Sequence, residues 1–124
     1  MENNNKTFDD LIDLMLSQAT RFLEEMGEFF PYGSILKSDT TLGTLGVYND
    51  DDDDFNATKA IDIFSNDIKK SINNNEILIG AIGIDVVING NENAIMIKAT
   101  NDGEKWHERC FPYTLKDNIV EIQR

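Results

Sequence analysis

Residues 22–48 read FLEEMGEFFPYGSILKSDTTLGTLGVY, and this stretch decides the fold. It begins in the last turns of an acidic amphipathic helix, which Gly27 ends because glycine readily takes the left-handed conformation of a helix terminus. Pro31 disfavours helical geometry at Phe30, so the chain turns there. We expect the ring of Phe29, of Phe30 or of both to close the end of the core at this corner.

The segment before this stretch predicts a long, heavily buried helix that ends at Gly27. Thr7 is placed to cap it, and carboxylates in its first turn suit the positive end of the helix dipole. Apolar residues recur at helical spacing: Phe8, Leu11, Ile12, Met15, Ala19, Phe22, Leu23 and Met26.

The rest of the chain predicts a hairpin, a second helix and four more strands. Residues 32–37 and 41–48 form the hairpin across residues 38–40, which lack the Asn-Gly or Asp-Gly pair of the commonest tight turns. The second helix covers residues 56–72, and the later strands are expected at 77–88, 94–100, 105–113 and 118–123. The order αββαββββ predicts one α+β domain over residues 1–124 with frayed residues 1–6. We expect an antiparallel sheet of five or six strands with two helices on one face.

The charge of the chain is strongly negative and unevenly distributed. The net charge is −12, with 13 acidic and 3 basic residues in positions 1–54 against 10 and 8 in positions 55–124. Nucleic acids and anionic membranes require clustered lysine and arginine, so neither is expected as a partner. A basic protein is the partner that this charge favours. The first ten residues show no signal-peptide pattern, so we expect a cytoplasmic protein.

The sequence carries no catalytic motif, and we expect no enzyme activity, cofactor or metal site. Cys110 and His107 are the only residues of their types and lie three apart on an expected strand. Their side chains therefore point to opposite faces, which disfavours a nucleophile–base pair. One histidine and one cysteine also fall short of a zinc site.

Five consecutive aspartates precede the second helix and have three interpretations. A calcium loop needs spaced oxygens and a glycine, which this run lacks. The alternatives are a solvated acidic loop and a surface that binds a partner. The run consists of Asp50, Asp51, Asp52, Asp53 and Asp54.

Glu24, Glu25 and Glu28 lie at the C-terminal end of the first helix, where the helix dipole disfavours negative charge. Glu24 and Glu28 are also a like-charge pair at i,i+4 spacing, offset nearby only by Arg21. Local rules are broken most often at functional sites, so this cluster is a candidate binding surface. The alternative is ordinary surface charge, because such penalties are small in solvent.

Asp85 interrupts the apolar strand at 77–88 and has two interpretations. A buried carboxylate would need partners and could serve catalysis. On an open sheet face it would be solvated, in phase with Ile77, Ile79, Ala81, Gly83 and Val87. An uncovered apolar face of this kind would favour a homodimer.

The corner resembles a group of small bacterial proteins of unassigned activity. They carry a helix that ends in acidic residues, followed by a Phe/Tyr-x-Pro-Phe/Tyr-Gly corner. The matching residues cover about a fifth of the chain and are Glu24, Glu25, Gly27, Phe29, Phe30, Pro31, Tyr32 and Gly33. Those proteins are similar in size and charge to immunity proteins, which neutralise bacterial toxins, and the resemblance implies such a role.

We therefore expect a non-enzymatic protein that binds a basic partner, such as a toxin, through its acidic segments. Aromatic residues that flank these segments would supply the affinity, while charge raises the association rate. The expected anchors are Tyr32, Tyr48 and Phe55. The alternatives are a small-molecule or enzymatic pocket that uses Asp85, His107 and Tyr113, and a structural protein that dimerises through its sheet.

Overall fold

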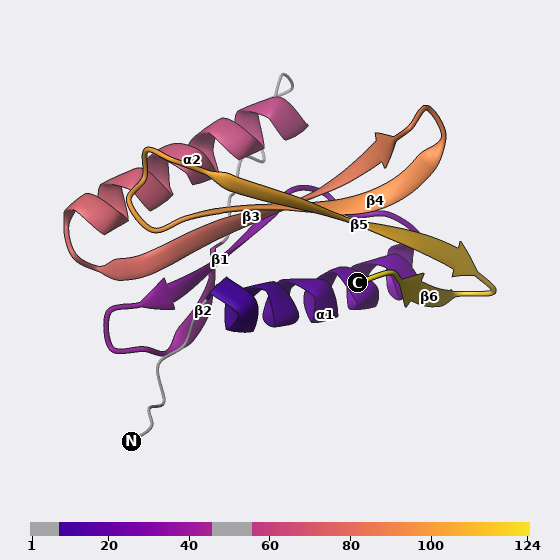
Figure 1. Cartoon of the computed structure of the whole chain (residues 1–124), viewed down its shortest axis with the longest axis horizontal. Helices are drawn as coiled ribbons and strands as arrows, with labels where there is room; N and C mark the ends of the chain where they lie inside the picture. Colours follow the sequence, from indigo (N-terminus) through magenta and orange to yellow (C-terminus); the bar gives the residue numbers. More distant parts are fainter. Residues whose placement is uncertain (1–7, 46–55) are drawn as a thin grey trace.

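The computed structural model describes residues 8–45 and 56–124, and it confirms the α+β class and the order αββαββββ. Six antiparallel strands form one curled sheet in the order β2-β1-β3-β4-β5-β6 (Figure 1). The expected frayed end at residues 1–6 and the last part of the first hairpin lie outside these ranges. The elements are α1 (Phe8–Met26), β1 (Tyr32–Lys37), β2 (Leu42–Leu45), α2 (Ala57–Asn73), β3 (Ile77–Ile88), β4 (Glu92–Thr100), β5 (His107–Lys116) and β6 (Ile119–Ile122).

The two helices lie on opposite faces of the sheet, so the prediction that both cover one face is wrong (Figure 1). Side chains alternate between the faces of a strand, and β3 shows both faces in use. Ile79 and Ala81 pack with α1, whereas Ile82 and Ile84 pack with α2. The chain leaves edge strand β2, passes over the second face as α2, and returns as β3 on the other side of β1.

The supposed open face of β3 is therefore a core. Ile79 and Ala81, which were expected on it, are buried under α1. Ile77 is also buried, but on the face of α2, because the pairing of β1 with β3 is irregular at its end. Of the residues expected on this face, only Val87, near the C-terminal end of β3, is largely exposed, at 62%. The expected dimerisation surface is absent at these positions.

Two glycines of β3 allow the helices and the corner to approach the sheet closely. A Cβ atom at Gly80 would lie 2.4 Å from Cγ2 of Ile68 on α2. A Cβ atom at Gly83 would lie 2.4 Å from the ring of Tyr32 on the opposite face. Because both distances are below van der Waals contact, each glycine is required by the side chain that rests on it.

Polar side chains close the loops that lack a standard turn sequence. At residues 38–40, Oδ1 of Asp39 accepts hydrogen bonds from the backbone N–H and the hydroxyl of Thr41, and Thr40 takes a φ of 69°. These bonds hold the pKa of the Asp39 carboxyl below its usual range. The predicted hairpin thus forms without an Asn-Gly pair, because the aspartate side chain fixes the turn.

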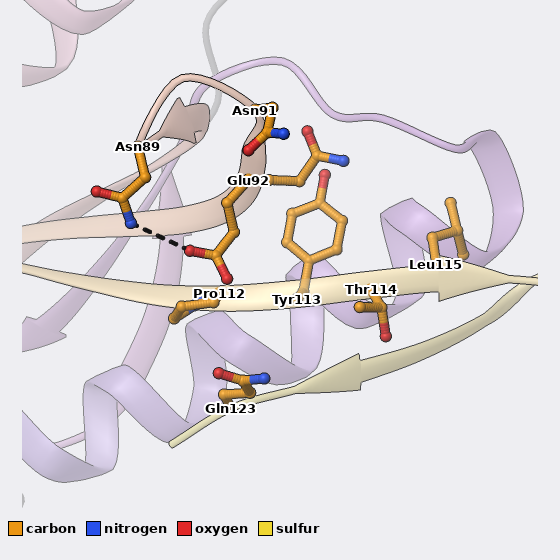
Figure 2. A pocket seen from close by; sticks show the side chains of 9 residues that line it. Asn89, Asn91, Glu92, Pro112, Tyr113, Thr114, Leu115 and Gln123 are labelled. Carbon is orange, nitrogen blue, oxygen red and sulfur yellow. Dashed lines mark hydrogen bonds between the residues drawn. The ribbon is translucent and has the colours of Figure 1, made fainter.

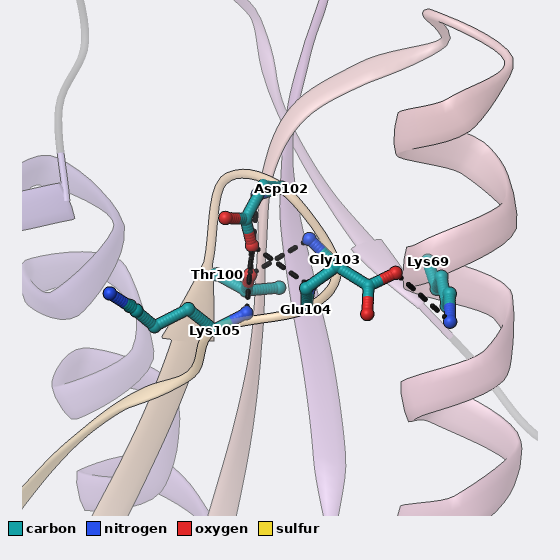
Figure 3. Close-up of polar contacts among 6 residues, drawn as sticks. All are labelled: Lys69, Thr100, Asp102, Gly103, Glu104 and Lys105. Atoms are coloured by element: carbon teal, nitrogen blue, oxygen red, sulfur yellow. Dashed lines mark hydrogen bonds and ion pairs between the residues drawn. The ribbon is translucent and has the colours of Figure 1, made fainter.

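The loop between β4 and β5 is fixed in the same way and joined to α2 (Figure 3). The buried hydroxyl of Thr100 accepts from the N–H of Gly103 at 2.9 Å, and Oδ1 of Asp102 accepts from the N–H groups of Glu104 and Lys105 at 2.8 Å each. An ion pair of 3.0 Å links Glu104 to Lys69 on α2. The loop therefore contacts α2 through this exposed ion pair.

Candidate binding surface

The corner after α1 separates one buried phenylalanine from one exposed phenylalanine. Gly27 ends the helix with a φ of 81°, and its N–H donates to the carbonyl of Leu23. Phe29 turns inward and is 8% exposed, whereas Phe30 turns outward and is 48% exposed. The expectation that at least one ring closes the core is confirmed for Phe29 alone.

Three rings close this end of the core. Phe22, Phe29 and Tyr32 lie with ring centroids 5.3–6.3 Å apart, and both contacts of Tyr32 are edge-to-face. The hydroxyl of Tyr32 donates to the carbonyl of Met15, and burial raises the pKa of that phenol. Tyr32 is thus a core residue at 9% exposure, and this burial does not fit the role of an anchor that contacts a partner.

An apolar surface remains at the corner. Met26 is 64% exposed and, with Glu28, Phe29 and Phe30, lines a shallow hollow of about 420 Å³. A second hollow of about 150 Å³ continues from Met26 and Phe30 over the three-ring cluster. We call Met26, Phe30 and the glutamates beside them, Glu24, Glu25 and Glu28, the acidic corner.

The three glutamates of the acidic corner differ in their contacts. Oε2 of Glu25 lies 3.3 Å from Nε of Arg21 in an exposed i,i+4 ion pair. Oε2 of Glu24 accepts a hydrogen bond of 3.1 Å from the backbone N–H of Val120. That contact occupies an outward N–H of edge strand β6, and a blocked edge resists pairing with another chain. Two of the three carboxylates therefore have a role within the fold, while Glu28 borders the hollow.

The remaining predicted anchors and the aspartate run are outside the described residues. They are Tyr48, Asp50, Asp51, Asp52, Asp53, Asp54 and Phe55. Sequence reasoning did not select Met26 and Phe30 as binding residues. The sequence nevertheless contained a signal for both residues. Met26 is the last apolar residue of the helix, next to Gly27, and one phenylalanine is enough to close this end of the core, which leaves the second one available for another role.

The alternative site of Asp85, His107 and Tyr113 is not assembled. The hydroxyl of Tyr113 donates to Oδ1 of Asp85 at 2.8 Å, and burial, with this bond, raises the pKa of the phenol. His107 lies six residues away on the same strand, about 20 Å along it. Its ring instead packs edge-on against Phe8 at 5.8 Å. The three groups therefore do not share one pocket.

Within residues 8–45 and 56–124, no three His, Cys, Asp or Glu side chains are grouped closely enough to hold a metal ion. No helix in that part of the chain is both long and apolar enough to cross a membrane. Comparison with protein-family models, with curated proteins and with solved structures finds no match to this chain.

Proposed function

We propose that this protein is a non-enzymatic binding protein that uses the acidic corner to dock onto a basic partner protein. The observation that carries this proposal is that two exposed apolar side chains, Met26 and Phe30, line one hollow together with the carboxylate of Glu28. Interfaces of this kind gain affinity from a few apolar anchors and gain association rate from complementary charge at their rim.

Glu25 and Glu24 are partly satisfied by Arg21 and by the backbone of β6, so their negative charge alone does not require a partner. Glu28 nevertheless lines the hollow together with Phe30, and the chain as a whole carries a net charge of −12. A partner with an apolar knob surrounded by lysine or arginine would complement both features.

A cytoplasmic immunity protein that masks a basic bacterial toxin is the form of this function that we favour. The resemblance of the EFFPYG corner to small bacterial proteins of immunity-like size and charge supports it. An immunity gene lies beside the gene of its toxin, so the product of the neighbouring gene is the partner to test. Binding would cover the basic surface with which such a toxin contacts its target.

The experiment measures association and dissociation rates of the purified neighbouring gene product with variants of this protein. Phe30→Ala should weaken binding by about tenfold or more, mainly through faster dissociation. Leu78→Ala is the matched control, since Leu78 is 44% exposed against 48% for Phe30 and lies at the start of β3, five residues before Gly83, which pairs with Tyr32 beside the corner. Equal losses for both variants, or no loss for Phe30→Ala, would contradict the proposal.

The role of charge is tested separately with Glu25→Gln and Glu28→Gln together, which leaves the Glu24 contact with β6 intact. We expect slower association at low salt and convergence with the unmodified protein at high salt. Asp62→Asn with Asp67→Asn on α2 removes the same charge elsewhere and should have a smaller effect. If both pairs slow association equally, net charge rather than the acidic corner steers the partner.

A further inference from the structure

A small apolar pocket lies between the first turns of α1 and the strands β4 and β5, and we call it the α1–β5 pocket. It has a volume of about 220 Å³. Three buried side chains form its floor, Ile12 from α1 and Ile97 and Ala99 from β4. All three belong to the core under α1, so the pocket is an opening into that core. The rest of its lining consists of Phe8, Asp9, His107 and Arg109.

The pocket opens at the first half of β5, which has no strand on its outer side. The ladder between β5 and β6 begins only at Tyr113. The pairing of β4 with β5 places Arg109 opposite Ile97 and His107 opposite Ala99. Cross-strand partners point to the same face of a sheet, so both polar side chains stand beside the apolar floor. Both are exposed, and they form the edge of the pocket toward solvent.

Arg109 supplies a positive charge at this edge. Its guanidinium carbon lies 4.9 Å from the centre of the Phe111 ring, and this cation–π contact holds the charged group on the face of α1. In the parts of the chain that the structure describes, no carboxylate forms an ion pair with Arg109. A guanidinium carries five N–H donors, and two of them bind a carboxylate together in a strong contact. The neighbouring His107 can add a donor from its ring.

The volume and the lining limit the ligand to a small, mainly apolar molecule. Protein cavities of about 150 Å³ hold a benzene ring. The α1–β5 pocket, with about 220 Å³, therefore takes such a ring with a short polar arm. A mostly apolar lining with a few polar groups at one side is usual for small-molecule sites. Asp9 lies at the α1 side and would favour an amine, but the two donors of β5 together favour an acid.

The larger hollow between the tips of the β3–β4 and β5–β6 hairpins has a different character (Figure 2). Its volume is about 620 Å³, and its lining is mainly polar, with Asn89, Asn91 and Asn93 on the side of the β3–β4 hairpin. Its aromatic residue, Tyr113, is buried and donates its hydroxyl to Asp85. This hollow therefore lacks an apolar floor, and it supplies a control position for the test below.

We propose that the α1–β5 pocket binds a small apolar carboxylic acid, with its hydrocarbon part on the floor of Ile97 and Ala99 and its carboxylate at Arg109. A ligand of about ten heavy atoms in a partly open pocket binds with a Kd of about 1 mM. The length of α1 places this pocket about 27 Å from the acidic corner, at the other end of the helix. The site therefore does not depend on the function proposed for the corner.

The probe is phenylacetate, titrated into the full-length protein with isotopically labelled isoleucine methyl groups. We expect NMR shifts at Ile12 and Ile97, with half-saturation at about 1 mM, and none at Ile68, which lies on the opposite face of the sheet. Phenylacetamide and phenethylamine carry the same ring without a negative charge and should bind at least fivefold more weakly. No shift at Ile12 and Ile97, or an amide or amine that binds as tightly as the acid, would overturn the proposal.

Variants test the contact with the carboxylate. Arg109→Gln should weaken the binding of phenylacetate at least fivefold and leave that of phenylacetamide unchanged, so altered folding cannot explain the loss. Asp9→Asn should strengthen the binding of phenylacetate, because it removes a like charge. Arg21→Gln takes the same charge from an exposed position of α1, and Asn93→Ala alters the hollow of Figure 2; neither should change binding more than twofold. Equal losses for Arg109→Gln and Arg21→Gln would contradict a contact at Arg109.

Three further measurements exclude other occupants of the pocket. The peptide acetyl-Gly-Gly-Phe carries a similar ring and carboxylate, and binding at least tenfold tighter than that of phenylacetate would identify a protein C-terminus as the ligand. Removal of residues 2–6 should change the affinity less than twofold, and a tenfold gain would show that this segment competes for the pocket. Shifts at Ile12 and Ile97 that follow protein concentration alone would show contact with a second copy. Each of these three results would overturn the proposal.

Discussion

The contact between Gly80 and Ile68 gives the sharpest test of how α2 is attached to the sheet. Gly80→Ala places a methyl group 2.4–2.9 Å from three side-chain carbons of Ile68, namely Cγ2, Cγ1 and Cδ1. Ile68 is fully buried and β-branched, so it cannot rotate away and the helix has to shift. Overpacking of this kind costs about 1–3 kcal/mol of unfolding free energy.

Ile68→Ala removes the same three carbons and should cost about 2–5 kcal/mol through lost burial and a cavity. In the double variant the methyl group at position 80 meets no Ile68 side chain and fills part of that cavity. The cost of the double variant should therefore be smaller than the sum of the single costs by about 1–3 kcal/mol, within the range of coupling for residues in contact.

Urea unfolding followed by circular dichroism measures the four free energies of the cycle. The control cycle combines Gly80→Ala with Ile95→Ala, another fully buried isoleucine, which lies in the core on the opposite face. Those two costs should add to within about 0.5 kcal/mol, because the two substituted side chains lie on opposite faces of the sheet. Additive costs for Gly80 and Ile68 would refute the close approach of α2 to β3.

Three further predictions concern polar groups. Thr100→Val should lower the unfolding free energy by about 1–3 kcal/mol in urea titrations, because the N–H of Gly103 loses its buried acceptor; an unchanged value would contradict the described loop. The backbone N–H groups of Lys105 and Glu104 lower the pKa of the Asp102 carboxyl, so its contribution is present above the unfolded pKa and lost as pH falls below about 4. Asp102→Asn should flatten the fall in stability measured there, and an unchanged acid slope would contradict this. Burial raises the pKa of the Tyr32 and Tyr113 phenols, so stability should fall as pH rises above about 10; an absorbance titration should show both ionising only on unfolding, and early ionisation of either would contradict its burial.

Periodicity and turn chemistry were sufficient to predict the elements. The strand at 32–37 and the central strand at 77–88 match β1 and β3 residue for residue. Among the later strands, β4 begins two residues earlier and β5 ends three residues later than predicted, because their polar ends continue the pairing beyond the apolar centres. The start of β5 is two residues later than predicted, and β6 is one residue shorter at each end. Pro112 was expected inside a strand, and it is tolerated because the strand pairing with β6 ends at Tyr113–Ile122 and beyond it only the carbonyl of Pro112 is used, as acceptor of the Gln123 N–H.

The side of the sheet on which each helix lies could not be read from element order alone. An αββαββββ chain can place α2 on either face, and the choice follows from which side chains of β3 are apolar. Between Ile79 and Ile84, β3 is apolar on both faces, which predicts a central strand. The same pattern also requires a helix on each face of the sheet, a consequence that the prediction of two helices on one face did not take into account. Gly80 and Gly83, one on each face of the strand, are the residues in the sequence that indicate the close approach of Ile68 on one face and of Tyr32 on the other.

The architecture also explains why the acidic corner is separable from the scaffold. The core under α1 is complete at Leu23 and is closed by Phe29 and Tyr32, so the fold does not require the side chain of Met26 to be apolar. Solvent exposure of large apolar groups lowers solubility, and neighbouring carboxylates offset that liability in a monomer. We therefore expect the acidic corner, whose exposed apolar side chains lie beside Glu28 and are not needed by the core, to form an interface that dissociates rather than a permanent one.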